Sequence, residues 1–232
     1  MSFKQTFDFG SESGEDAVDS TEALEARLSA LRERIISESE RTDLLDLAKL
    51  RLDEGEILNA LERGEEAWKI VRPIFDLFVE AREWELAAEA CDVLSQSNHQ
   101  DALVALANGI WLSVTFPVNP QVTTSLLQYV IDDTPDDSDG AAVAAAVAKY
   151  VIDLRADEDS HNDLSFFATQ MMGEVARRHS DINSQEAFDQ WARKLELDDP
   201  SKFLVRMRNV LDVMAQDDWW IDRDALRDQL PE

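Results

Sequence analysis

The chain has few of the residues that make tight turns: only 7 Gly and 6 Pro among 232 residues. Sandwiches and barrels of many short strands need such residues roughly every 8 to 12 positions, so this scarcity argues against an all-β fold. Cysteine is also scarce, because Cys91 is the single one. One thiol can form neither an intrachain disulfide nor a thiolate cluster for zinc or iron and sulfur. We therefore expect a reducing, cytoplasmic compartment.

Long apolar runs are missing as well. No window approaches the roughly 18 consecutive apolar residues that are needed to cross a bilayer. Residues 1–20 contain no apolar stretch of the kind that forms a signal peptide. The sequence thus predicts a protein that does not enter a membrane.

Basic residues are outnumbered: 22 Lys and Arg face 49 Asp and Glu, which gives a net charge of −27. Proteins bind nucleic acid by neutralising phosphates with Lys and Arg, so direct nucleic-acid binding is excluded. The excess is uniform, with −14 in residues 1–115 and −13 in residues 116–232. It favours a protein partner with a basic surface. Asp (28) outnumbers Glu (21) and only 6 bases are Lys, so adaptation to a saline cytoplasm is an open alternative.

Helical periodicity dominates what is present, and the sequence predicts an all-α fold of about nine to ten antiparallel helices. Residues 1–19 mix Gly, Ser and acids without a period, which predicts a disordered acidic arm. From Asp19 apolar residues recur at helical steps until near Ser39, at Leu24, Leu28, Leu31 and Ile35. This stripe predicts an amphipathic helix that packs on the body or pairs with another chain.

A second pattern covers residues 42–95, where Gly55, Gly64 and Pro73 are the residues expected to interrupt helices. Large and small apolar residues alternate there in an order that resembles one tetratricopeptide repeat. The positions that carry it are Leu44, Leu47, Ala48, Gly55, Ile57, Ala60, Ala67 and Pro73. A degenerate second copy follows at Phe75, Phe78, Trp84, Ala87, Cys91 and Leu94. The resemblance implies paired antiparallel helices.

The best internal boundary is the acidic loop at 132–139. It divides a helical-repeat-like region, 20–131, from a C-terminal helical bundle, 140–232, against which the first region packs; one continuous domain is the alternative. Small residues dominate 141–155, so we expect this helix to be central. Asn119 and Asp199 each precede a proline, which predicts a capped helix start at both.

Recognisable catalytic chemistry is absent from the sequence. His99, His161 and His179 have no zinc-ligand spacing. In the acidic loop, a calcium-loop alignment on Gly140 places Pro135 at the first ligand position. Phosphate-loop, dinucleotide and nucleophile-elbow motifs are missing. We predict no catalytic, cofactor or metal site, and an inert Cys91 on an apolar helix face.

Two groups of aromatic residues are candidate partner anchors, and both border acidic segments. Phe3, Phe7 and Phe9 belong to the N-terminal arm, and Trp219 and Trp220 lie among aspartates near the C-terminus. The leading hypothesis is a non-catalytic interaction module, acting as a scaffold, adaptor or assembly chaperone, that binds through the concave face of the helices in residues 42–111. The alternatives are an acidic regulator that mimics nucleic acid and a helical enzyme without a known motif. The oligomeric state stays open.

Overall fold

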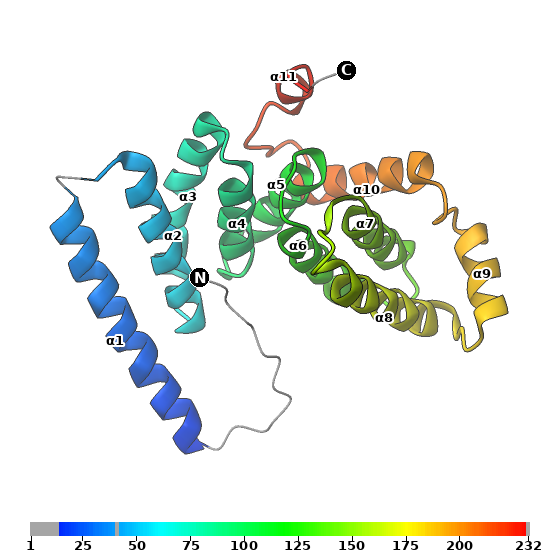
Figure 1. The fold of residues 1–232 in the computed structure, drawn as a ribbon, viewed down its shortest axis with the longest axis horizontal. Helices are drawn as coiled ribbons and strands as arrows, with labels where there is room; N and C mark the ends of the chain where they lie inside the picture. Colours follow the sequence, from blue (N-terminus) through cyan, green and yellow to red (C-terminus); the bar gives the residue numbers. More distant parts are fainter. Residues whose placement is uncertain (1–13, 40–41, 231–232) are drawn as a thin grey trace.

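The fold is all-α in a computed structural model that describes residues 14–39 and 42–230. Eleven helices and no strand occur in these residues (Figure 1). The helices are α1 (Gly14–Glu38), α2 (Leu44–Ala60), α3 (Gly64–Ala81), α4 (Trp84–Ser95), α5 (Ala102–Thr115), α6 (Pro120–Asp133), α7 (Asp139–Arg155), α8 (His161–Ser180), α9 (Gln185–Lys194), α10 (Pro200–Ala215) and α11 (Arg223–Arg227). Among the described helices, none is both long and apolar enough to span a bilayer.

Helices that follow one another in the chain form an extended array of hairpins (Figure 1). Extensive packing joins α2 to α3, α3 to α4, α4 to α5, α6 to α7 and α7 to α8. In addition, α4 lies beside both α2 and α6. The long helix α1 covers α2 at one end, while α10 returns to pack on α5 and α7. Side-by-side helices α2, α4 and α6 therefore share one layer of the array.

Polar side chains begin several helices at the positions that the sequence predicts. Asn119 Oδ1 accepts a hydrogen bond from the backbone N–H of Gln121, with Pro120 in the first turn of α6. Asp199 caps α10 in the same way. Proline suits the first turn because its missing N–H would have no helical partner there. The predicted starts of α6 and α10 are confirmed.

Two of the predicted helix interruptions, at Gly55 and Pro73, are wrong, and the first helix begins earlier than predicted. Gly55 lies buried inside α2, where a side chain would place its Cβ 2.3 Å from Cγ2 of Val71. It is needed for close helix packing and makes no turn. Pro73 lies within α3, whose buried apolar face continues on both sides of it and stabilises the helix. Helix α1 begins at Gly14, five residues before Asp19.

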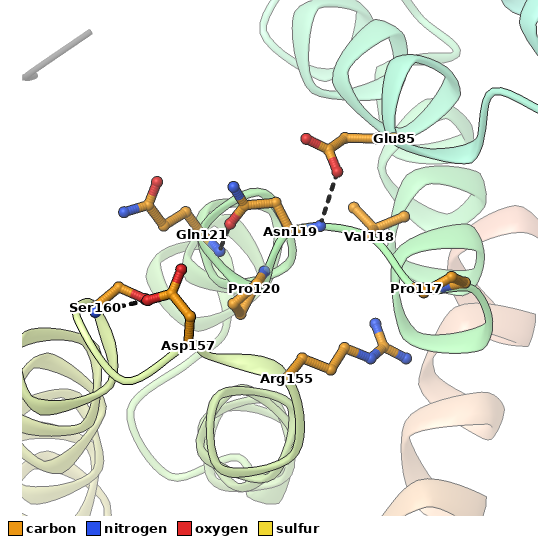
Figure 2. A pocket seen from close by; sticks show the side chains of 9 residues that line it. All are labelled: Glu85, Pro117, Val118, Asn119, Pro120, Gln121, Arg155, Asp157 and Ser160. Carbon is orange, nitrogen blue, oxygen red and sulfur yellow. Dashed lines mark hydrogen bonds between the residues drawn. The ribbon is translucent and has the colours of Figure 1, made fainter. Parts of the chain in front are cut away.

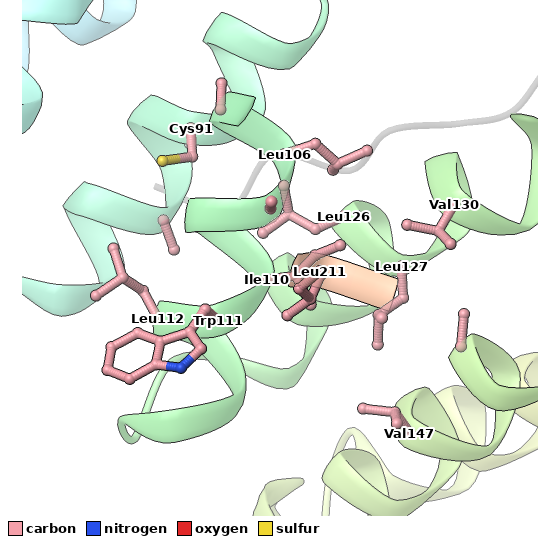
Figure 3. Close-up of a cluster of buried hydrophobic side chains, with 14 of the residues drawn as sticks. Cys91, Leu106, Ile110, Trp111, Leu112, Leu126, Leu127, Val130, Val147 and Leu211 are labelled. Carbon is pink, nitrogen blue, oxygen red and sulfur yellow. The ribbon is translucent and has the colours of Figure 1, made fainter. Parts of the chain in front are cut away.

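One cluster of buried side chains runs from α1 to the segment after α10. Leu28 and Ile35 of α1 are buried, so that predicted stripe packs on the body. The predicted central helix is α7, which is buried along most of its length and packs on α6, α8 and α10. Figure 3 shows the junction where α4, α5, α6, α7 and α10 meet, around Ile110, Leu127 and Leu211. The regions on both sides of the acidic loop contribute to this core.

Candidate functional site: an acidic groove on α2, α4 and α6

A groove of about 500 Å³ opens on the layer formed by α2, α4 and α6. Three of its side chains are carboxylates: Glu56 from α2, and Glu89 and Asp92 from α4. We call this surface the acidic groove. Its remaining lining residues are Asn59, Ala60, Val93, Gln96, Gln121, Val122 and Ser125. The groove thus combines negative charge with an apolar strip from Val93 and Val122.

The carboxylates of the acidic groove are held in an unfavourable environment for negative charge. Burial and four neighbouring carboxylates, from Asp53, Glu56, Glu85 and Asp92, raise the pKa of Glu89 to about 7. Burial raises the pKa of Asp92 to about 6, although hydrogen bonds from Gln96 and Tyr129 oppose the change. Burial also raises the pKa values of Glu56 and Asp53. Near neutral pH, Glu89 is therefore only partly ionised.

Hydrogen bonds fix the wall between α2 and α4. Asn59 Nδ2 donates to the backbone carbonyl of Val93 at 2.7 Å, which joins the end of α2 to α4. The Oδ1 atom of Asn59 is buried and has no hydrogen-bond partner within the described residues. At the end of α4, Gln96 Nε2 lies 3.2 Å from Asp92 Oδ1. The carboxylate of Asp92 is thereby oriented by its own helix.

A second hollow, of about 550 Å³, adjoins the acidic groove and shares Gln121 with it. Figure 2 shows Glu85 of α4 at its rim, accepting a hydrogen bond from the backbone N–H of Asn119 at 3.1 Å. Arg155 lies on the other side and donates to the backbone carbonyls of Ser113 and Val114, both at 2.6 Å. Its guanidinium is therefore bound by the end of α5 and not by a carboxylate of the acidic groove.

The tryptophans predicted as anchors lie elsewhere and are half-buried against their own chain. Trp220 packs edge-on against Trp68 and Phe75 of α3, with the guanidinium of Arg72 4.1 Å from its ring centroid. The Trp219 ring carries the guanidinium of Arg223 at 3.7 Å. Neither tryptophan lines the acidic groove. The other predicted anchors, Phe3, Phe7 and Phe9, lie outside the described residues.

Other reactive side chains do not gather into a site. Cys91 is fully buried, and burial raises its pKa well above the usual thiol value, as expected for an unreactive thiol. Within residues 14–39 and 42–230, no group of three or more His, Cys, Asp or Glu side chains is arranged to hold a metal ion. His99 stacks on Trp68 with ring centroids 3.8 Å apart. His179 bonds to Asp139 at 3.1 Å.

The acidic groove was not predicted from the sequence, although a signal for it exists. Glu85, Glu89 and Asp92 recur at helical spacing, as do Asp53 and Glu56, so each set shares one helix face. Such spacing is common among 49 acidic residues. Only the packing of α2 beside α4 shows that the two faces meet.

Comparisons with known proteins do not add an identity to this description. No protein family, curated protein or solved structure matches the chain.

Proposed function

We propose that the protein is a non-catalytic interaction module whose acidic groove binds a Lys- or Arg-rich segment of a partner protein. The observation that carries this proposal is the convergence of Glu56, Glu89 and Asp92 in one half-buried groove between packed helices. The proposal extends the concave-face hypothesis from the sequence, with α6 added to the helices that contribute.

The burial of the carboxylates in the acidic groove supports a role in binding a cationic segment. Raised carboxylate pKa values mean that the groove disfavours its own negative charge in the free protein. A cationic side chain placed among these groups would favour the ionised forms and return their pKa values toward the usual range. Residues that weaken the free chain but suit a cationic ligand are typical of binding sites. The apolar strip of Val93 and Val122 would contact the aliphatic stems of Lys or Arg.

Binding of a cation should release protons, because Glu89 is partly protonated near neutral pH. Calorimetric titration in two buffers of different ionisation enthalpy measures that release directly. We expect nona-arginine peptide to bind with proton release at pH 7, and the released fraction to fall at pH 8.5, where Glu89 is already ionised.

The decisive comparison uses two triple variants that each remove three carboxylates and so make the same change in formal net charge. The groove variant is Glu56→Gln, Glu89→Gln and Asp92→Asn. The control variant is Asp137→Asn, Glu158→Gln and Asp217→Asn, at exposed loop positions. We expect the groove variant to weaken nona-arginine binding at least tenfold at ~150 mM salt and the control less than twofold.

Equal weakening by both triple variants would contradict a specific groove and assign the affinity to the overall charge of −27.

Capture of a partner protein, followed by addition of duplex DNA, tests the nucleic-acid-mimic alternative. A DNA-binding protein captured by the chain and released by duplex DNA would favour that alternative. A basic partner that duplex DNA leaves in place would favour the interaction module.

A further inference from the structure

Among the described helices only α7 packs extensively on α8, and the exposed side of α8 carries a stripe of five residues. Its residues recur at steps of 3, 4, 3 and 4, which places them along one side of a helix. They are Asp163, Phe166, Gln170, Gly173 and Arg177. The opposite side of α8 is buried through Ala168, Met171, Val175 and Ala176. The stripe therefore has the spacing of a helix–helix contact but lies on the exposed side of the helix, where its own chain borders it only across a hollow beside Gly173.

Phe166 is the most conspicuous residue of this stripe, because its side chain is 65% exposed. Gly173 lies two turns farther along, and the nearest atom to the Cβ it lacks is Arg177 Nη1 at 3.5 Å. Glycine inside a helix costs about 1 kcal/mol relative to alanine. No close approach within the described chain requires it at this position. A close approach from outside the chain would.

A hollow of about 370 Å³ lies beside Gly173. Thr169, Gly173 and Arg177 of α8 line one side, and Ile182 and Phe188 contribute apolar surface on the other. A cavity of about 150 Å³ is enough to hold a benzene ring. The hollow can therefore accept an aromatic side chain, and the same helix face presents one at Phe166.

We propose that α8 pairs with α8 of a second copy of this chain in an antiparallel, two-fold symmetric dimer. In a two-fold interface each surface patch must complement itself, so a protrusion and its matching hollow must occur on the same face. With the axis near Gln170, Phe166 of one copy lies opposite Gly173 of the other. Each phenyl ring then enters the hollow of its partner and contacts the guanidinium of Arg177.

The charges at the ends of the stripe obey the same symmetry. Asp163 and Arg177 each lie seven residues from Gln170, on opposite sides of it. Antiparallel pairing places Asp163 of one copy against Arg177 of the other, twice per dimer. Arg177 is exposed, so its guanidinium can reach a carboxylate of a second copy. Charge, shape and register thus favour a second copy of this chain as the partner that binds this face.

Sedimentation equilibrium of the full chain at ~150 mM salt tests the proposal. We expect a dimer whose dissociation constant rises at least tenfold in Phe166→Ser, while Val213→Ser on α10, at a side chain that is 75% exposed, changes it less than twofold. Gly173→Leu should also weaken the dimer by filling the hollow. Circular dichroism must show unchanged helicity in every variant.

Charge reversal tests the register. Asp163→Arg and Arg177→Asp should each weaken the dimer severalfold, and the double variant should recover most of the affinity. Overall repulsion between two chains of −27 predicts something different. It would make Asp163→Arg strengthen the dimer and would allow no recovery in the double variant.

Cross-linking adds a test of the axis. Gln170→Cys should form a disulfide-linked dimer under a mild oxidant, since the native Cys91 is buried, and Asp189→Cys on α9 should not. A wild-type chain that stays monomeric at about 100 μM, or a dimer indifferent to Phe166→Ser and to both charge reversals, would overturn the proposal.

Discussion

Arg32 on α1 donates from Nε to the carboxylate of Glu54 on α2 at 2.6 Å, and the side chain of Glu54 is only 1% exposed. The other carboxylate oxygen accepts from Arg51 Nη1, also at 2.6 Å. A buried carboxylate is costly unless it is paired. The first helix is therefore attached to the array by a buried, doubly bonded charge in addition to the apolar contacts of Leu28 and Ile35.

Removing both arginines should be far more damaging than removing the carboxylate. Arg32→Ala with Arg51→Ala leaves Glu54 buried without a partner, and we expect a loss of about 3 to 5 kcal/mol in the free energy of unfolding. Urea unfolding measures it. Adding Glu54→Gln to the double variant should restore much of the loss, because the uncompensated charge disappears. No recovery would mean that the arginines act through packing.

Glu89 should make stability depend on pH in the range between its pKa in the unfolded chain and its pKa in the folded chain. The folded-state pKa of about 7 exceeds the usual glutamate value of 4.5, so between these pH values the folded chain keeps a proton that the unfolded chain has lost. Stability should therefore fall as pH rises from 4.5 to 7, and the penalty should be complete above pH 7. Glu89→Gln should stabilise the chain at pH 8 by about 2 kcal/mol and flatten this part of the profile.

The matched control for that experiment is Glu158→Gln, which removes an exposed acid from a loop. Its unfolding free energy should stay within about 0.5 kcal/mol of wild type at both pH 5 and pH 8. A similar gain in both variants at pH 8 would assign the effect to net charge and contradict the role of burial.

Gly64→Ala should destabilise the chain, because the added Cβ would lie 2.2 Å from the backbone carbonyl oxygen of Ser97. Backbone cannot move aside cheaply, so we expect a loss of about 1 to 3 kcal/mol. Gly173→Ala is the control, since its Cβ would meet only the end of the flexible Arg177 side chain, at an ordinary contact distance of 3.5 Å, and alanine favours the helix. Thermal unfolding at a concentration where the chain is monomeric should show opposite signs for the two variants.

Trp220→Ala should lower stability whether or not a partner uses this tryptophan. Its ring contacts Trp68, Phe75 and Arg72, and alanine would lose all three contacts. Truncating a packed aromatic of this kind costs about 3 kcal/mol. Chemical denaturation measures the loss. A stability unchanged by Trp220→Ala, combined with lost partner binding, would instead favour the anchor role.

The helical class and several helix ends were predictable because they depend on local chemistry. Asn119 and Asp199 cap helices through bonds to residues two positions away, and the stripe of Leu28 and Ile35 follows a single helix. Gly55 was mistaken for a break because its reason lies across the fold, in the side chain of Val71. Local patterns cannot reveal a contact between residues of different helices.

The acidic groove could not be predicted from local sequence patterns for the same reason. Glu56 and Glu89 are 33 positions apart and become neighbours only when α2 and α4 lie side by side. The effect of Glu56 on the pKa of Glu89 follows from that juxtaposition. By contrast, the burial of Cys91 was predictable from the small apolar residues around it on one helix face.

Helix α10 has a consequence for how the molecule comes apart. Arrays in which each hairpin touches only its neighbours can fray stepwise from either end. In this fold α10 packs on α5 and α7, which precede it by many residues in the chain. Amide protons of α5, α7 and α10 should consequently exchange with solvent in a single concerted opening, while α1, held on one side by α2, can detach at lower free energy.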